Sequence, residues 1–321
     1  MKKIILKKNK IYSVKKKLFS IFNLNNWNIV KISGKDSKKY LQNQITSNIN
    51  FLKENKYIFC GHCNYQGRII STLIIFKKNN NYFYILRKSI CDVQIQAMKK
   101  YSVFFNVKIK KYNKCYLLGI FKKSSYIQLK KFFKVLPNKK NPVIHKKNIT
   151  IIFLNFLKKI FLLISFNKNL DFLKNKFIKF NFLNDEKKIL FIHIKKNIPI
   201  IEKKTSLLFF PQEINLDKFK KSIDFNKGCY IGQENISKIK YKNLNKNILS
   251  SLYCRDENST SSIFSPGNFV YVKIKRSWIK KGILLSSVII NKITYVQVVL
   301  NCVFKIHNIY KINNFYFKNL L

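Results

Sequence analysis

The chain has 321 residues, with 64 lysines and arginines against 13 aspartates and glutamates, so its formal net charge is +51 at pH 7. This length predicts two or three domains, and a hydrophobic content of 47% excludes a wholly disordered chain. The apolar run within residues 1–7 is too short for a secretory signal, and lysines interrupt the most apolar stretch at 151–166, so we expect no membrane span. Seven scattered cysteines are typical of a reducing compartment, which predicts a cytoplasmic protein.

The positive charge comes almost entirely from lysine. Arginine occurs at only four positions, which are Arg68, Arg87, Arg255 and Arg276. Asparagine, isoleucine, phenylalanine and tyrosine are also abundant, and AT-rich codons encode these residues and lysine, so the charge first indicates codon bias in a reduced bacterial genome. A dedicated RNA-reading surface favours arginine, because its planar guanidinium matches phosphate and base edges. A solvated lysine surface is therefore favoured, and direct binding of tRNA stays open as the alternative.

The first two thirds of the chain alternate between helical and strand patterns. After a basic, loosely held segment over 1–20, the expected elements are a helix from Asp36 or Ser37 through Leu41, strands over 57–63, 68–76 and 82–86, a helix over 89–100, and strands over 103–109 and 115–121. Turn chemistry at 64–67 joins the first two strands, and Ser89 with Asp92 resembles a capping box. A helix over 125–135, strands over 150–154 and 160–166, a helix from Leu170 and a helix over 186–196 follow. This alternation predicts an α+β region over 21–245.

Beyond residue 245 the pattern is all β. The expected strands lie over 248–254, 269–274, 282–290 and 294–299, with a turn at Pro266 and Gly267. Short strands of this spacing predict a small β-barrel, which would form a separate domain over 246–321.

One short segment combines several chemically useful residues. It contains Lys227, Gly228, Cys229, Tyr230, Gly232, Gln233 and Glu234, and holds two of the eight glycines of the chain. Glycines permit close backbone approach, and a lysine two residues before a cysteine favours the reactive thiolate. Gln233 and Glu234 add polar groups for a ligand. The residues alone also fit a plainer interpretation, a tight turn with a half-buried thiol.

This segment matches the signature K-G-C-Y-x-G-Q-E of YgfZ-type proteins at every specified position, and the chain resembles that family in further segments. They lie at 24–27, 34–46, 62–68, 101–104 and 211–216, in the family's order. The resemblance therefore extends over residues 24–305.

The resemblance implies a fold and a ligand. The fold is the three-domain ring of the glycine-cleavage T-protein, with ferredoxin-like α/β modules and a C-terminal β-barrel. The ligand is tetrahydrofolate or another reduced folate in the central channel, where the family uses two tryptophans. Trp27 matches the first, whereas Ile189 stands at the second position and cannot stack or donate an indole hydrogen bond. The arginine-containing segment that follows the family signature carries lysines here, at 237–243.

The resemblance also implies a function, with Cys229 as the functional thiol. The chain would be a folate-binding accessory protein in tRNA modification that acts by maintaining or repairing iron-sulfur enzymes, with a link to replication regulation. Its partners would be folate and iron-sulfur enzymes, including tRNA-modifying enzymes, and it would be a monomer and not an independent classical enzyme.

Two other functions remain open at this point. A folate-dependent aminomethyltransferase shares the fold, but the T-protein uses an acidic residue in the strand after its first hairpin, and residues 69–74 contain none. A non-enzymatic RNA-binding module is supported only by the charge.

The remaining cysteine and histidine patterns predict no further site. The segment Cys60 to Cys63 has the C-G-H-C pattern of disulfide isomerases, but an apparent strand and a turn follow it, not the helix that a redox pair needs. A second ligand pair for zinc is absent from the sequence at a suitable spacing. His145, His193 and His307 are isolated and are expected to be structural or exposed.

Overall fold

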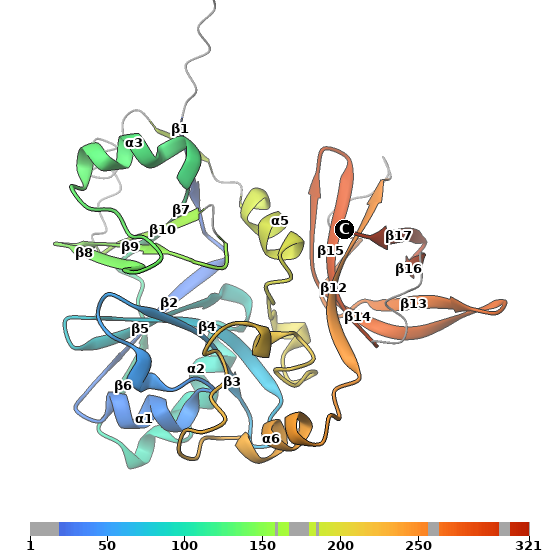
Figure 1. The fold of residues 1–321 in the computed structure, drawn as a ribbon, viewed down its shortest axis with the longest axis horizontal. Coiled ribbons are helices and arrows are strands. Elements are labelled where there is room, and N and C mark those ends of the chain that lie inside the picture. The colour runs from blue at the N-terminus through green and yellow to red at the C-terminus, as the bar shows by residue number, and fades with distance from the viewer. Residues whose placement is uncertain are drawn as a thin grey trace, which may run out of the picture.

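The computed structural model describes residues 19–157, 160–166, 180–183, 186–255, 263–301 and 309–320. In this part of the chain the strands form a five-stranded sheet, a six-stranded sheet and a closed barrel (Figure 1). The predicted α+β fold with a C-terminal β-barrel is confirmed. The expectations for residues 1–18, for the helix beginning at Leu170 and for His307 lie outside the described residues.

The five-stranded sheet is antiparallel, in the order β3-β4-β5-β2-β6. Its strands are β2 (Trp27–Ser33), β3 (Tyr57–Cys63), β4 (Ile69–Lys78), β5 (Asn81–Arg87) and β6 (Lys108–Lys111). One face packs against α1 (Ser37–Gln44) and α2 (Cys91–Lys99), which lie below the sheet in Figure 1. The Tyr40 hydroxyl joins these helices by donating to the carbonyl oxygen of Met98 at 2.6 Å.

The six-stranded sheet has the order β11-β1-β7-β10-β9-β8. Its strands are β1 (Phe19–Asn23), β7 (Tyr116–Phe121), β8 (Val143–Lys146), β9 (Ile149–Phe153), β10 (Ile160–Ser165) and β11 (Phe180–Leu183). The helix α3 (Lys122–Phe132) covers its outer face through Leu129. Its inner face meets the free face of the five-stranded sheet in the largest core of the described chain, which includes Phe83, Ile85, Ile152 and Leu162. Burying each of these side chains contributes about 1.5–3 kcal/mol.

The barrel closes in the order β12-β15-β14-β13-β16-β17. Its strands are β12 (Asn247–Arg255), β13 (Phe269–Ile274), β14 (Ser277–Ile290), β15 (Ile293–Asn301), β16 (Tyr310–Ile312) and β17 (Phe315–Asn319). The helix α5 (Lys187–Lys195), predicted over 186–196, packs against β14 and β15. Gln297 of β15 fixes the segment after α5, donating to the Ile198 carbonyl at 3.0 Å and accepting from the Ile200 amide at 3.2 Å.

The predicted strand over 103–109 is wrong in its first half. Ser102–Phe104 form a 3-10 helix, and β6 begins only at Lys108. The Phe105 amide donates to the Ser102 carbonyl at 3.0 Å, and the side chains of Val103 and Phe104 are exposed. Apolar residues with high strand propensity therefore stay outside the sheet, because no neighbouring strand lies along them.

The predicted capping box at Ser89 is also wrong. The helix α2 begins at Cys91 without a side-chain cap, after a 3-10 turn at Lys88–Ile90. The Ser89 hydroxyl donates instead to the carboxylate of Glu202, which lies far along the chain. A long-range partner thus replaces the local cap.

Other boundaries differ less. The helix α3 begins and ends earlier than the predicted range 125–135, because Phe133 is already extended. Strands β1, β2, β8, β11, β16 and β17 were not expected from the pattern. Within the described ranges, no helix combines the length and the apolar character that crossing a membrane requires.

Candidate functional site

The signature loop over 227–234 is held from its inner side by Lys227. This side chain is buried, and its ammonium donates to the carbonyl oxygens of Gln42 at 2.6 Å, Ile45 at 2.6 Å and Ser47 at 2.9 Å. These carbonyls lie at the end of α1 and just beyond it, where helical carbonyls lack partners within the helix. Burial lowers the pKa of Lys227 to about 8. The three hydrogen bonds commit its charge to the interior, so an anchoring role replaces the direct effect on the thiolate that we inferred from spacing.

The next residues close the loop on itself. The Gln233 side chain accepts a hydrogen bond from the Tyr230 amide at 3.1 Å and donates to the Lys227 carbonyl at 3.4 Å. The Tyr230 ring is buried, with its centroid 4.6 Å from the Lys227 ammonium. From this closed loop α6 (Gln233–Tyr241) begins, with Glu234 in its first turn.

Two glycines bring the loop against the hairpin between β3 and β4. Gly232 has φ +80°, and a Cβ there would lie 2.4 Å from the Asn64 carbonyl oxygen and 2.7 Å from the Cα of Gly67. A Cβ at Gly67 would in turn lie 3.0 Å from the Gly232 oxygen. This contact leaves no room for side chains, so both glycines are required by geometry.

The outer side of the loop is open. Cys229 and Gly228 are exposed, and a Cβ at Gly228 would meet no atom within 4 Å. The residues that fix the loop therefore all lie beneath it, and the thiol is presented to solvent by a rigid support. Such an arrangement is able to hold a nucleophilic or metal-ligating sulfur in place.

The structure places Trp27 in a second group of residues, built around Arg87. Trp27 begins β2 and lies opposite Arg87, the last residue of β5. The Arg87 guanidinium lies 5.0 Å from the centroid of the Trp27 ring and pairs with Glu186 at 2.9 Å and Glu202 at 2.6 Å. On the same indole, the His193 ring packs at a centroid distance of 5.6 Å. Residues from four separate segments therefore meet here, which sequence spacing does not reveal.

Three buried polar atoms of this group have no hydrogen-bond partner among the described residues. They are Nε1 of Trp27, Nδ1 of His193 and Oε2 of Glu186. Burial, and secondarily the charge of Arg87, lower the pKa of His193 to about 3, so its ring is neutral at pH 7. Buried polar atoms without partners are costly unless a water or a ligand satisfies them. The indole N–H and the carboxylate oxygen of this group are each able to form a hydrogen bond with a polar ligand.

A cavity of about 520 Å³ adjoins this group. Arg87, Ser89 and Glu202 line one side, Leu190 of α5 lines another, and barrel residues such as Phe264 and Ser287 complete it. Trp27 itself is not among the lining residues and lies behind the Arg87 guanidinium. The size falls within the range of small-molecule sites.

Ile189, the second predicted folate position, points into the large core. Its side chain is 2% exposed, and its Cδ1 lies 2.3 Å from the position that a Cβ on Gly119 would occupy. The isoleucine therefore packs on bare backbone of β7. A tryptophan placed here would need this part of the core to move, since overpacking costs about 1–3 kcal/mol or more.

No family model matches the chain, but curated relatives do. The "tRNA-modifying protein YgfZ" of Buchnera aphidicola subsp. Acyrthosiphon pisum is 39% identical over 311 residues, which cover 96% of this chain and 95% of that protein. The protein of the same name from Blochmanniella pennsylvanica is 39% identical over 287 residues, covering 88% and 87%. The chain belongs to the YgfZ family.

The fold of this YgfZ-family chain is similar to that of a solved structure of another protein. That structure is a glycine cleavage system aminomethyltransferase T from Bartonella henselae, with a TM-score of 0.70 over 94% of this chain and 85% of the other. At 9% sequence identity this likeness concerns the fold alone. It confirms the expected T-protein-like architecture.

The lysines of the segment 237–243 and the arginines of this chain have different partners. In the segment 237–243, where the family carries arginine, Lys238 and Lys240 project from α6, and the Lys240 ammonium lies 3.8 Å from the centroid of the Phe225 ring. The arginines that this chain does keep at 68 and 87 form ion pairs, Arg68 with Glu213 at 3.5 Å and Arg87 with its two carboxylates. In a chain with only four arginines, the presence of arginine was the available signal for Arg87.

Cys60 and Cys63 lie on opposite faces of β3. Cys60 packs in the core under α1 and α2, whereas Cys63 packs in the core between the two sheets. Burial raises the pKa of Cys60 to about 12 and raises that of Cys63 further above its usual value. Two thiols on opposite faces of a sheet cannot form a disulfide or bind one ion together. Among the described residues, no three histidine, cysteine or acidic side chains gather as a metal site requires.

We therefore expect Cys60 and Cys63 to be dispensable for activity. A double variant, Cys60→Ala with Cys63→Ala, should complement a YgfZ-deficient strain like the parent, because both thiols only fill core space. Its Tm should fall by several degrees, since each small truncation in a core costs about 1 kcal/mol. A double variant that folds and yet fails to complement would contradict this expectation.

Proposed function

We propose that the chain is a folate-binding accessory protein of tRNA modification that uses the exposed Cys229 thiol. The observation that carries the folate part is the set of buried, unpartnered polar atoms around Trp27. The family membership and the relatives named for tRNA modification support the rest of the proposal.

The residues present fit a reduced folate. The Trp27 N–H offers a donor, and Glu186 offers a carboxylate oxygen, both buried and unpaired. Hydrogen bonds to two carboxylates hold the Arg87 guanidinium in a fixed orientation, from which its planar group is able to stack on a planar ligand. The neutral His193 packs behind the indole and keeps it in place. A bound reduced folate would supply a one-carbon carrier at this position.

Further parts of the proposal rest on the family resemblance. We propose that the protein acts through maintenance or repair of iron-sulfur enzymes, including tRNA-modifying enzymes, as a cytoplasmic monomer, with a link to replication regulation. We also propose that residues 21–245 and 246–321 are its separate units, which limited proteolysis would test by releasing a fragment at the boundary.

Calorimetry with tetrahydrofolate tests the folate site. Trp27→Ala should weaken binding by roughly fivefold to tenfold, because stacking and an indole hydrogen bond each contribute about 1 kcal/mol. The chain offers a matched control, since its other tryptophan, Trp278, lies on the barrel strand β14 against Tyr316. Trp278→Ala should leave the affinity unchanged.

Two results would contradict the folate proposal in different ways. Equal affinity of the parent and Trp27→Ala would remove Trp27 from the site. If neither protein binds tetrahydrofolate, the chain has kept the fold without the ligand.

A further inference from the structure

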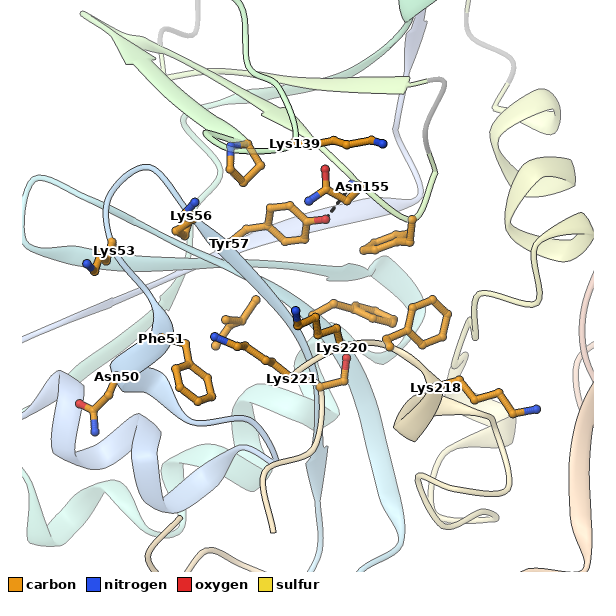
Figure 2. A pocket seen from close by; sticks show the side chains of 16 residues that line it. Asn50, Phe51, Lys53, Lys56, Tyr57, Lys139, Asn155, Lys218, Lys220 and Lys221 are labelled. Carbon is orange, nitrogen blue, oxygen red and sulfur yellow. Dashed lines mark hydrogen bonds between the residues drawn. The ribbon is translucent and has the colours of Figure 1, made fainter. Parts of the chain in front are cut away.

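A further cavity lies outside the region of Trp27 and Cys229. It has a volume of about 730 Å³ and lies where β3, the loop before β8, the loop after β9 and the segment over 218–222 come together (Figure 2). We call it the lysine pocket. Its lining includes six lysines, which are Lys53, Lys56, Lys139, Lys218, Lys220 and Lys221.

The charge in the lysine pocket is not balanced. No aspartate or glutamate lines it, and within the described residues none of its lysines forms a salt bridge. Among the described residues, Lys56 is the one lysine of the pocket whose ammonium donates to a backbone carbonyl, that of Lys140. Several ammonium groups around one concavity repel one another and attract anions, because the protein walls concentrate the field. A cavity whose lining carries this excess of positive charge is suited to an anionic ligand.

The floor and rim of the lysine pocket are aromatic. Phe59, Phe156 and Phe219 pack together with centroid distances of 5.0 to 5.7 Å. The Tyr57 hydroxyl accepts the Asn155 amide at 2.8 Å, as the dashed line in Figure 2 shows. At the rim, Phe51 is exposed and has the Lys221 ammonium 3.9 Å from its ring centroid. A ring beside a cation offers a stacking surface next to an anion site.

We propose that the lysine pocket binds a nucleotide, either free or within single-stranded RNA, with phosphates on its lysines and a base on Phe51. Lysines and aromatic faces are the two elements by which proteins hold single-stranded nucleic acid without reading its sequence. A simple anion would use the lysines but would gain nothing from an exposed aromatic ring. The cavity is also large enough to hold a nucleotide.

This site is separate from the proposed folate site. Tyr57 pairs with Phe76 in β4, which pairs with Phe83 in β5, whereas Trp27 pairs with Arg87 at the far end of β5. The two sites therefore lie at opposite ends of the five-stranded sheet and share no lining residue. The nucleotide proposal does not rest on folate binding, so an experiment can contradict one of the two proposals and leave the other intact.

The experiment needs a control for nonspecific binding, because any protein with such a high positive charge binds RNA weakly. One full-length variant carries Lys53→Gln, Lys139→Gln and Lys220→Gln in the pocket. The matched variant carries Lys273→Gln, Lys275→Gln and Lys318→Gln on the barrel, so both lose three charges from exposed positions. Fluorescence anisotropy with a labelled oligouridine at several salt concentrations then measures affinity and its salt dependence for each.

We expect the pocket variant to bind oligouridine at least tenfold more weakly than the parent at about 0.1 M salt, and the barrel variant to stay within about twofold. The slope of log K against log salt should fall by about 2 in the pocket variant, because each lost phosphate contact lowers it by about 0.7 on single strands. Phe51→Ala should weaken binding by roughly fivefold or more without changing the slope, since stacking releases no counterions.

Competition with AMP distinguishes the two sources of the ligand. Displacement of the labelled oligouridine by AMP, in the parent but not in the pocket variant, assigns the site to a free nucleotide. Failure of AMP to compete, together with the lysine effect, assigns it to RNA. Equal losses in the pocket and barrel variants would overturn the proposal, because the binding would then follow total charge alone.

Discussion

Cys229→Ala is expected to abolish complementation of a YgfZ-deficient strain while the Tm stays within about 2 °C of the parent. The thiol is exposed, and the hydrogen bonds that hold its loop come from Lys227, Gln233 and backbone groups. Removing an exposed side chain with no packing role changes stability by about 0.5 kcal/mol or less. Complementation and a thermal melt on the same variant provide the two measurements.

Cys229→Ser refines this expectation. Serine keeps the approximate size of the side chain, but its hydroxyl is a much weaker nucleophile and metal ligand than sulfur. It should therefore fail like alanine if the thiolate reacts or binds a metal. Full complementation by Cys229→Ala would show that the thiol is not the functional centre, and a large loss of Tm would indicate a structural thiol.

The parts of the fold that could be predicted are those with local signals. The hairpin of β3 and β4 has turn residues between two apolar runs, and the barrel strands β12, β13 and β15 alternate clearly, so both were expected near their observed positions. Val103 and Phe104 carry the same strand signal but lie in a 3-10 helix, because a strand also needs a neighbour with open hydrogen bonds. That neighbour is a property of the tertiary fold.

The candidate sites divide in the same way. The signature segment was recognisable from its glycines and its cysteine, but the direction of Lys227 was not, because its three carbonyl partners lie about 180 residues away in sequence. The group around Trp27 could be predicted only in part. Arg87 is one of four arginines in a chain that otherwise uses lysine, yet its partners Glu186 and Glu202 are distant and have no spacing pattern. The lysine pocket could not be predicted, because lysines are frequent throughout the sequence and those of the pocket do not stand out from the rest.

The second large effect is expected at Gly232. In Gly232→Ala the new Cβ would lie 2.4 Å from the Asn64 carbonyl oxygen and near two backbone atoms of Gly67, none of which is the end of a flexible side chain. The residue also has φ +80°, a conformation that costs an L side chain about 1 kcal/mol or more. The loop and hairpin must therefore separate, at a cost of roughly 2–4 kcal/mol. We expect the Tm to fall by roughly 5–10 °C and complementation to be lost.

Gly228→Ala is the matched control, because it is the same substitution in the same loop. Its Cβ would meet nothing within 4 Å, and Gly228 is not among the residues with positive φ, so the Tm should not change. Nothing in the part of the chain that the structure describes therefore requires glycine beside Cys229. If a partner or substrate approaches the thiol closely, the added methyl group will reduce complementation in a protein of normal stability. Full complementation by Gly228→Ala would mean that the space beside the thiol is not used, whereas a normal Tm for Gly232→Ala would contradict the close contact between the loop and the hairpin.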